Sequence, residues 1–121
     1  MDTIKAMETH RLLPVVVIDD ADKAARLAST LAENGLPVVE FTLRTPAALD
    51  AIRAAANIPG VLVGAGTVLT VEQAEQAVDA GATFLVSPGV SVAVIEWAVR
   101  TGITIFPGVA TGTEIMTAMA A

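Results

Sequence analysis

Glu40 is the residue whose type and position first suggest chemistry. It interrupts PVVEFTL (residues 37–43), an otherwise apolar segment with the length of a buried strand, where it shares one face with Val38 and Thr42. A buried carboxylate is unfavourable unless it is paired or hydrogen-bonded. An apolar environment raises its pKa, which suits a general base. An ion-paired structural glutamate, or an exposed residue on an edge strand, explains the same position.

Other polar residues follow the ends of apolar segments. Arg44 comes after the segment that holds Glu40, and a guanidinium can bind a carboxylate through two parallel hydrogen bonds. In Gly64-Ala65-Gly66-Thr67 the glycines let the backbone approach a ligand, and Thr67 offers a hydroxyl. A surface arginine and a tight turn are the structural alternatives. Turns are the simplest interpretation of Ser87-Pro88-Gly89 and Pro107-Gly108, and either turn could also shape the wall of a pocket.

Nucleophiles and metal ligands are scarce. The two lysines, Lys5 and Lys23, lie outside the expected strands, and Lys23 follows Asp19 and Asp20 at the spacing of a helical salt bridge. We assign neither to a Schiff base, which needs a desolvated amine. The single His10 is expected to be an exposed helix residue rather than a metal ligand. The absence of cysteine excludes disulfides, thiolate metal sites and a cysteine nucleophile. We expect no metal and no cofactor.

The elements that must position these residues repeat every 20–24 residues or so as strand, turn and Ala-rich helix, a pattern typical of a parallel sheet. We expect strands over residues 13–18, 37–43, 61–65, 83–87 and 103–106. The expected helices cover residues 20–35, 46–56, 71–80, 92–100 and 113–120, after a short amphipathic helix in MDTIKAMETHR. With no linker, residues 1–121 form a single domain.

Two architectures use such repeats, the doubly wound open sheet and the (β/α) barrel of TIM type. We favour the barrel because polar residues recur at the carboxyl ends of successive strands, where a barrel gathers them at one mouth, and because no GxGxxG fingerprint is present. These residues are Glu40, Thr42, Arg44, Thr67, Ser87 and Thr111. About five of the eight units of a barrel are expected, which leaves an incomplete barrel with an open sheet edge.

Composition narrows the function. Apolar residues make up 54% of the 121-residue chain, and the net charge is −6 with no basic cluster. Binding to nucleic acid or to an anionic membrane surface needs concentrated positive charge, so neither is expected. No apolar run approaches the roughly 18 residues that span a bilayer, and the N-terminus lacks an apolar signal core. We therefore expect a cytoplasmic protein.

Four segments in order resemble one family: VVEFTLRT (residues 38–45), VGAGTVLT (63–70), FLVSPG (84–89) and IFPGVAT (105–111). They are similar to the 2-keto-3-deoxy-6-phosphogluconate (KDPG) and 4-hydroxy-2-oxoglutarate (KHG) aldolases from residue 12 onward, and the related 6-phosphogalactonate aldolase shares much of the pattern. The resemblance implies a homotrimeric barrel and metal-free class I aldol chemistry that releases pyruvate and an aldehyde. It implies Glu40 as the acid/base, Arg44 and Thr67 as ligands of the pyruvate carboxylate, and Pro88 as part of the pocket lining.

The resemblance also implies a Schiff-base lysine on a sixth strand, in a segment like K-x-F-P-A, with phosphate-binding loops later still. Neither motif occurs in these 121 residues, so we expect the chain by itself to be inactive as an aldolase. Three hypotheses follow: part of an aldolase; a non-catalytic or engineered partial barrel that folds by self-association; or a different phosphate-binding barrel enzyme, such as a relative of thiamine-phosphate synthase.

Overall fold

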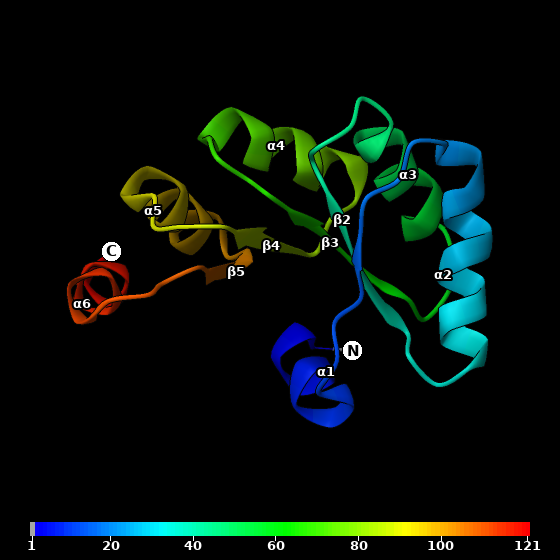
Figure 1. The fold of residues 1–121 in the computed structure, drawn as a ribbon, viewed down its shortest axis with the longest axis horizontal. Coiled ribbons are helices and arrows are strands. Elements are labelled where there is room, and N and C mark those ends of the chain that lie inside the picture. The colour runs from blue at the N-terminus through cyan, green and yellow to red at the C-terminus, as the bar shows by residue number, and fades with distance from the viewer. Residues whose placement is uncertain (1) are drawn as a thin grey trace.

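A computed structural model describes residues 2–121, and it contains a five-stranded parallel sheet with six α-helices (Figure 1). The strands are β1 (Val15–Val16), β2 (Val38–Thr42), β3 (Leu62–Gly66), β4 (Phe84–Ser87) and β5 (Thr104–Pro107). The helices are α1 (Thr3–His10), α2 (Ala24–Glu33), α3 (Ala48–Ala56), α4 (Val71–Ala80), α5 (Val92–Thr101) and α6 (Gly112–Ala120), with a short 3₁₀ helix, η1 (Ala21–Lys23), before α2. The predicted parallel α/β class is confirmed.

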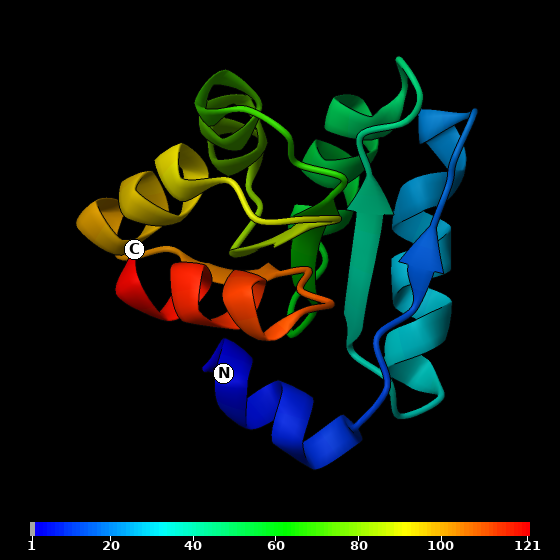
Figure 2. The ribbon, with the colours of Figure 1, turned by 60° about the vertical axis from the view of Figure 1, so that its left-hand side comes forward.

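The strands lie side by side in their order along the chain, β1-β2-β3-β4-β5. Every pair is parallel, and a helix follows each strand before the next one begins (Figure 2). A doubly wound sheet instead reverses its strand order at a switch point. Within residues 2–121 no such reversal occurs, so the doubly wound alternative does not describe this sheet.

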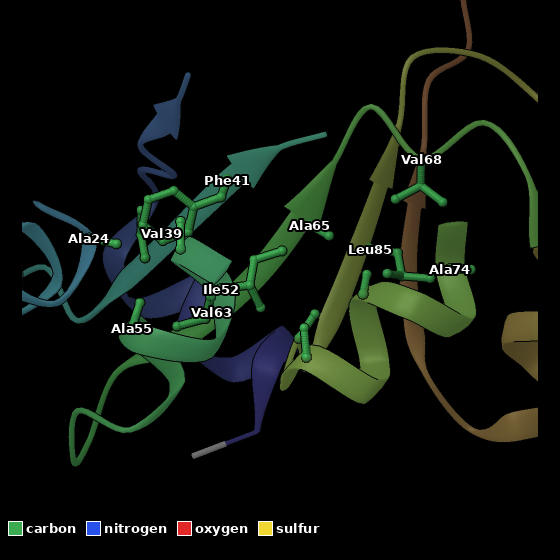
Figure 3. Packing of buried hydrophobic residues seen from close by; sticks show 14 of the residues in the cluster. Ala24, Val39, Phe41, Ile52, Ala55, Val63, Ala65, Val68, Ala74 and Leu85 are labelled. Carbon is green, nitrogen blue, oxygen red and sulfur yellow. The ribbon is translucent and has the colours of Figure 1, made fainter. Parts of the chain in front are cut away.

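The hydrophobic core lies between the sheet and helices α2 to α5, which line one side of it (Figure 1). Strand side chains alternate between two faces, and Val39, Phe41, Val63, Ala65 and Leu85 point to the helix side (Figure 3). The helices contribute mainly alanines to this layer, with the larger Ile52 and Trp97 filling space between them. Small side chains let helices approach the sheet closely, which accounts for the high alanine content.

The opposite face of the sheet carries the remaining side chains of the strands. Glu40 aligns with Gly64, and Gly64 aligns with Phe84, so these three positions form one row across the sheet. Phe84 packs edge-on against Phe106 of β5, with ring centres 6.0 Å apart. Helix α1 lies on this side of the sheet (Figure 1), where its Met7 and Phe106 line a common apolar hollow.

The expected boundaries hold within about two residues for most elements, and the first strand is the main exception. Residues 13–18 were expected to be extended, but the ladder of β1 contains only Val15 and Val16. Pro14 has no N–H to donate and joins the sheet only through its carbonyl, which accepts the N–H of Glu40 at 2.9 Å. Beyond Val16, the hydroxyl of Thr45 binds the carbonyl of Ile18 at 2.5 Å in place of a ladder bond.

Two expectations about single side chains are wrong. Lys23 forms no helical salt bridge with Asp19 or Asp20: Arg53 and Asp50 form the one ion pair found within residues 2–121. Asp20 instead accepts the N–H of Asp22 and caps η1, a turn that breaks the helical spacing expected there. His10 ends α1 but is half-buried rather than exposed, and its Nε2 is buried without a hydrogen-bond partner.

No helix in the described part of the chain is both long enough and apolar enough to cross a lipid bilayer.

The packing between sheet and helices predicts a large difference between buried and exposed positions. Leu85 is fully buried on β4 between Ala65 and Ile105, so Leu85→Ala should lower the free energy of unfolding by about 2–5 kcal/mol. Val99 on α5 is 66% exposed, and Val99→Ala should change it by less than about 0.5 kcal/mol. Urea denaturation of both variants checks this. Equal losses at the two positions would contradict the proposed core.

Candidate active site

Glu40 lies in the middle of β2 and is buried, with 4% of its surface exposed. Its carboxylate rests above the backbone of Gly66: a Cβ built on Gly66 would lie 1.7 Å from Glu40 Oε1. Gly66 aligns with Thr42, which is two residues closer than Glu40 to the carboxyl end of β2. The side chain of Glu40 therefore leans along the sheet toward the carboxyl edge of the strands.

The electrostatic environment of Glu40 is that of an unpaired buried acid. Within residues 2–121 its carboxylate forms no ion pair, so the structural alternative of an ion-paired glutamate does not apply. Its oxygens are not among the buried polar atoms that lack a hydrogen-bond partner, so they reach solvent although the residue as a whole is buried. Burial raises the pKa of Glu40 above its ordinary value, and the nearby charge of Arg44 partly opposes this rise. A carboxyl whose pKa is raised toward the working pH is better suited to accept and return a proton than an ordinary one.

Arg44 and Thr67 are brought together at the carboxyl edge by the last bond between β2 and β3. The N–H of Leu43 donates to the carbonyl of Gly66 at 2.8 Å, and Arg44 and Thr67 are the residues that directly follow this pair. Arg44 is exposed, while Thr67 is half-buried. An exposed guanidinium at this edge could bind the carboxylate of a small acid, and a hydroxyl could add a hydrogen bond.

The backbone of Thr67 has an uncommon conformation. Its φ is +57°, in the left-handed region that β-branched residues rarely adopt. The residues on either side are well held, since Gly66 ends β3 and the N–H of Val68 donates to the carbonyl of Val86 at 3.2 Å. Strained backbone of this kind clusters at functional sites, because the surrounding structure must maintain it.

Pro88 lies one strand further along the same edge, after β4. It is exposed and lines a hollow of about 210 Å³ with Gly108 and Glu114, and none of Glu40, Arg44 or Thr67 lines this hollow. The N–H of Gly108 donates to the carbonyl of Ser87 at 2.8 Å, so the loops after β4 and β5 are joined. The structure thus groups Glu40, Arg44 and Thr67 closely and places Pro88 beside this group.

Glu114 was not among the residues singled out from the sequence. Its carboxylate accepts the N–H groups of Ala110 and Thr111, at 2.6 and 3.0 Å, and these bonds hold its pKa below the ordinary value. The hydroxyl of Thr111 in turn accepts the N–H of Glu114, which completes a capping box at the start of α6. The Thr-x-x-Glu spacing is the sequence signal that identifies it. This box orders the loop after β5, which forms one wall of the Pro88 hollow.

A family model for the aldolases, described as KDPG and KHG aldolase, matches residues 3–121. The chain belongs to this family. It is 42% identical to the 2-dehydro-3-deoxy-phosphogluconate aldolase of Zymomonas mobilis over 115 residues, which are 95% of this chain and 55% of that protein. The chain spans about half the length of the curated relatives it matches.

Solved structures give the same assignment. The crystal structure of the 2-keto-3-deoxy-6-phosphogluconate aldolase of Zymomonas mobilis matches with a TM-score of 0.93 at 40% identity, covering 99% of this chain and 58% of that one. The KDPG aldolase of Legionella pneumophila, captured with pyruvate as a covalent carbinolamine intermediate, matches with a TM-score of 0.84 at 39% identity, covering 89% and 53%. Family membership disfavours the third hypothesis drawn from the sequence, a different phosphate-binding barrel enzyme.

The described residues of this aldolase-family chain contain no group of three or more His, Cys, Asp or Glu side chains that could hold a metal ion. The lysines, Lys5 on α1 and Lys23 on η1, are both exposed and lie on helical segments rather than strands. Neither has the desolvated environment that a Schiff-base amine needs.

The burial of Glu40 predicts a pH-dependent cost to folding. Because its pKa is higher in the folded chain than the ordinary 4.5, the folded state binds the proton more tightly, and stability falls as pH rises above about 4.5. Glu40→Gln removes this cost. The variant should therefore gain stability over the wild type as pH is raised from 4 to 7, measured by urea denaturation at each pH. Glu75→Gln, an exposed position on α4, controls for the loss of one negative charge; a gain for Glu40→Gln that is independent of pH would contradict the prediction.

The left-handed backbone of Thr67 predicts an unusual order of variants. Glycine adopts a φ of +57° without strain, so Thr67→Gly should be about 1 kcal/mol more stable than Thr67→Ala. At Glu75, inside helix α4, the order should reverse, with the glycine variant about 1 kcal/mol less stable than the alanine variant. Thermal or urea unfolding of the four variants decides the matter. The same order at both positions would show that Thr67 is not held in this conformation.

Proposed function

We propose that the protein to which these residues belong is a class I aldolase that cleaves a 2-keto-3-deoxy-6-phospho sugar acid, or 4-hydroxy-2-oxoglutarate, to pyruvate and an aldehyde. With KDPG the aldehyde is glyceraldehyde 3-phosphate, and with 4-hydroxy-2-oxoglutarate it is glyoxylate. The observation that carries the proposal is the placement of Glu40: a buried, unpaired carboxylate that leans toward the edge of the sheet where Arg44 and Thr67 meet. Family membership supports the reaction class.

Glu40 would serve as the acid/base in this reaction, relaying protons through water. In a class I aldolase the C2 carbonyl of the substrate first forms an imine with an amine of the enzyme. Cleavage then requires that the hydroxyl on C4 lose its proton while the C3–C4 bond breaks and its electron pair moves toward that imine. The resulting enamine takes up a proton at C3 before hydrolysis releases pyruvate. One carboxyl can receive the first proton and return one in the second step, and the raised pKa of Glu40 suits both roles.

Arg44 and Thr67 would bind the carboxylate of the keto acid. Arg44 carries the charge, and Thr67 follows Gly66 at the same point of the edge, so both flank the direction in which Glu40 leans. A carboxylate held here would fix the substrate relative to Glu40, as proton transfer requires. Pro88, exposed one strand away, would line the side of the pocket.

The amine of the imine would come from outside these 121 residues. The carbinolamine of pyruvate in the Legionella pneumophila relative supports a nucleophilic amine in the family. Lys5 and Lys23 are exposed and lie on α1 and η1, not on a strand of the sheet. We propose that neither reacts with pyruvate productively, and that the 121-residue chain alone has no aldolase activity.

Closure of the sheet into a TIM-type barrel and assembly into a homotrimer are further parts of the proposal, as the family resemblance implies. The sequential parallel strand order and the helices on one side of the sheet support the barrel. In the five-stranded sheet, β1 and β5 are the edge strands, and further strands would have to join them to close the barrel. Exposed apolar side chains on α6, among them Met116 at 73% and Met119 at 82%, support association with other polypeptide surfaces. A cytoplasmic location also stays a prediction.

Two preparations test the function. The 121-residue chain, treated with pyruvate and sodium borohydride, should gain no reduced adduct. A chimera, in which the chain replaces the matching first half of the Zymomonas mobilis enzyme, should be trapped by pyruvate and should cleave KDPG. In the chimera, Glu40→Gln should lower kcat by about 10²–10⁴-fold, as for other general acid–base residues.

Intact and peptide mass spectrometry and a coupled pyruvate assay give the readouts. A pyruvate adduct on Lys5 or Lys23 would overturn the assignment of the amine. A chimera that retains full activity after Glu40→Gln would overturn the role of Glu40, with Glu75→Gln as the matched control.

A further inference from the structure

Gly64 and Gly66, the two glycines of the segment Gly64-Ala65-Gly66, each leave space for a neighbouring side chain. A Cβ on Gly64 would meet the ring of Phe84, with the nearest ring carbon at 2.2 Å. The three atoms nearest to a Cβ on Gly66 would all belong to the side chain of Glu40: Oε1 at 1.7 Å, Cδ at 2.6 Å and Cγ at 2.9 Å. Both glycines have ordinary backbone angles, so a requirement for left-handed geometry does not explain them.

The two positions differ in what would have to move. The ring of Phe84 is fully buried and packs against Phe106, so a methyl group on Gly64 would disturb the packed face of the sheet. Above Gly66 lies the far end of a flexible side chain that no hydrogen bond holds. A methyl group there would displace the carboxylate of Glu40 by rotation of its side chain and leave the β2–β3 ladder intact.

We propose that Gly66 is a positioning residue for the candidate catalytic acid: its missing Cβ is the space in which the Glu40 carboxylate lies, directed at the carboxyl edge of the sheet. The inference rests on the proposed function for its catalytic consequence, but not for its structural content. This role for Gly66 differs from the one suggested by the sequence, in which the glycines let the backbone approach a ligand.

The pKa of Glu40 depends mainly on where its carboxylate lies relative to the sheet and to Arg44. The neighbouring strands β1, β3, β4 and β5 carry no ionisable residue within their bounds, and the charge that acts on Glu40 is that of Arg44. Burial raises the pKa of Glu40. Displacing the carboxylate toward water, or toward Arg44, therefore lowers that pKa in either case.

The direct test is a carboxyl ¹³C NMR titration of the 121-residue chain labelled at the glutamate side chains. Gly66→Ala should keep the folded spectrum and move the midpoint of Glu40 down toward the ordinary value of 4.5. Gly112→Ala adds the same methyl group at the start of α6, where nothing lies within 4 Å, and should leave the Glu40 midpoint unchanged. A folded Gly66→Ala chain with the wild-type midpoint would overturn the proposal.

A second variant covers the case in which Gly66→Ala does not fold. Glu40→Ala removes the side chain that the new methyl group would meet. The double variant Gly66→Ala/Glu40→Ala should therefore regain a folded spectrum, and its Tm should recover most of the decrease caused by Gly66→Ala alone. If the double variant is as unfolded as Gly66→Ala, then the backbone rather than the carboxylate requires glycine, and the proposal fails.

The catalytic consequence is measured in the chimera described above. A carboxylate displaced by about 1 Å or more should lower kcat by about 10²-fold, with KM changed little because Arg44 and Thr67 stay in place. The two ideas fail separately. A shifted midpoint with unchanged kcat would remove the catalytic role of Glu40 and keep the positioning by Gly66, whereas an unshifted midpoint removes the positioning itself.

Discussion

The fit between the carboxylate of Glu40 and the empty position above Gly66 is the contact on which the candidate site depends. Burying a carboxylate is unfavourable, and here no ion pair within residues 2–121 offsets that cost, which is limited only by the contact of its oxygens with solvent. Gly66 offers the space in which the carboxylate lies, and the ring of Phe84 lies over Gly64, the next glycine of the same segment. Under the proposed function this unfavourable burial lies where a proton would move, and perturbed carboxyl groups of this kind cluster at functional sites.

Apolar burial elsewhere in the sheet offsets the free-energy cost of burying Glu40. On the helix side, Val39, Phe41, Val63 and Leu85 pack against α2 to α5 and provide the favourable burial. Glu40 is on the other face because strand side chains alternate, so it does not interrupt this core. One strand, β2, thus supplies core residues to one face and the acid to the other, and the stability of the first face supports the second.

The carboxyl edge of the sheet concentrates the other candidate residues. Successive parallel strands end at the same edge, and the bond between Leu43 and Gly66 brings Arg44 and Thr67 next to each other although they are far apart along the chain. The capping box of Thr111 and Glu114 then orders the loop after β5 at the same edge. Family members described as KDPG aldolases share this fold at about 40% identity, in keeping with a common arrangement of these strands.

Much of this could be read from the sequence because it depends on local pattern. The run PVVEFTL predicts a buried strand, and alternation within it already places Glu40 on the same face as Thr42. Gly81 and Gly102, with positive φ, follow α4 and α5, whose ends lie within one residue of the expected ones. The length of β1 was overestimated, because apolar composition does not reveal which N–H groups find a partner across the sheet.

The sequence by itself determined the order of strands and helices, the parallel class of the sheet and the identity of the unusual acid, since each follows from periodicity and from the position of one charged residue in an apolar run. Only the tertiary structure decided that the acid forms no ion pair within the described residues, that its carboxylate lies over Gly66, and that Thr67 has a left-handed backbone. Those features depend on the register between β2 and β3 and on side-chain direction, which couple residues about 26 positions apart that no local pattern relates.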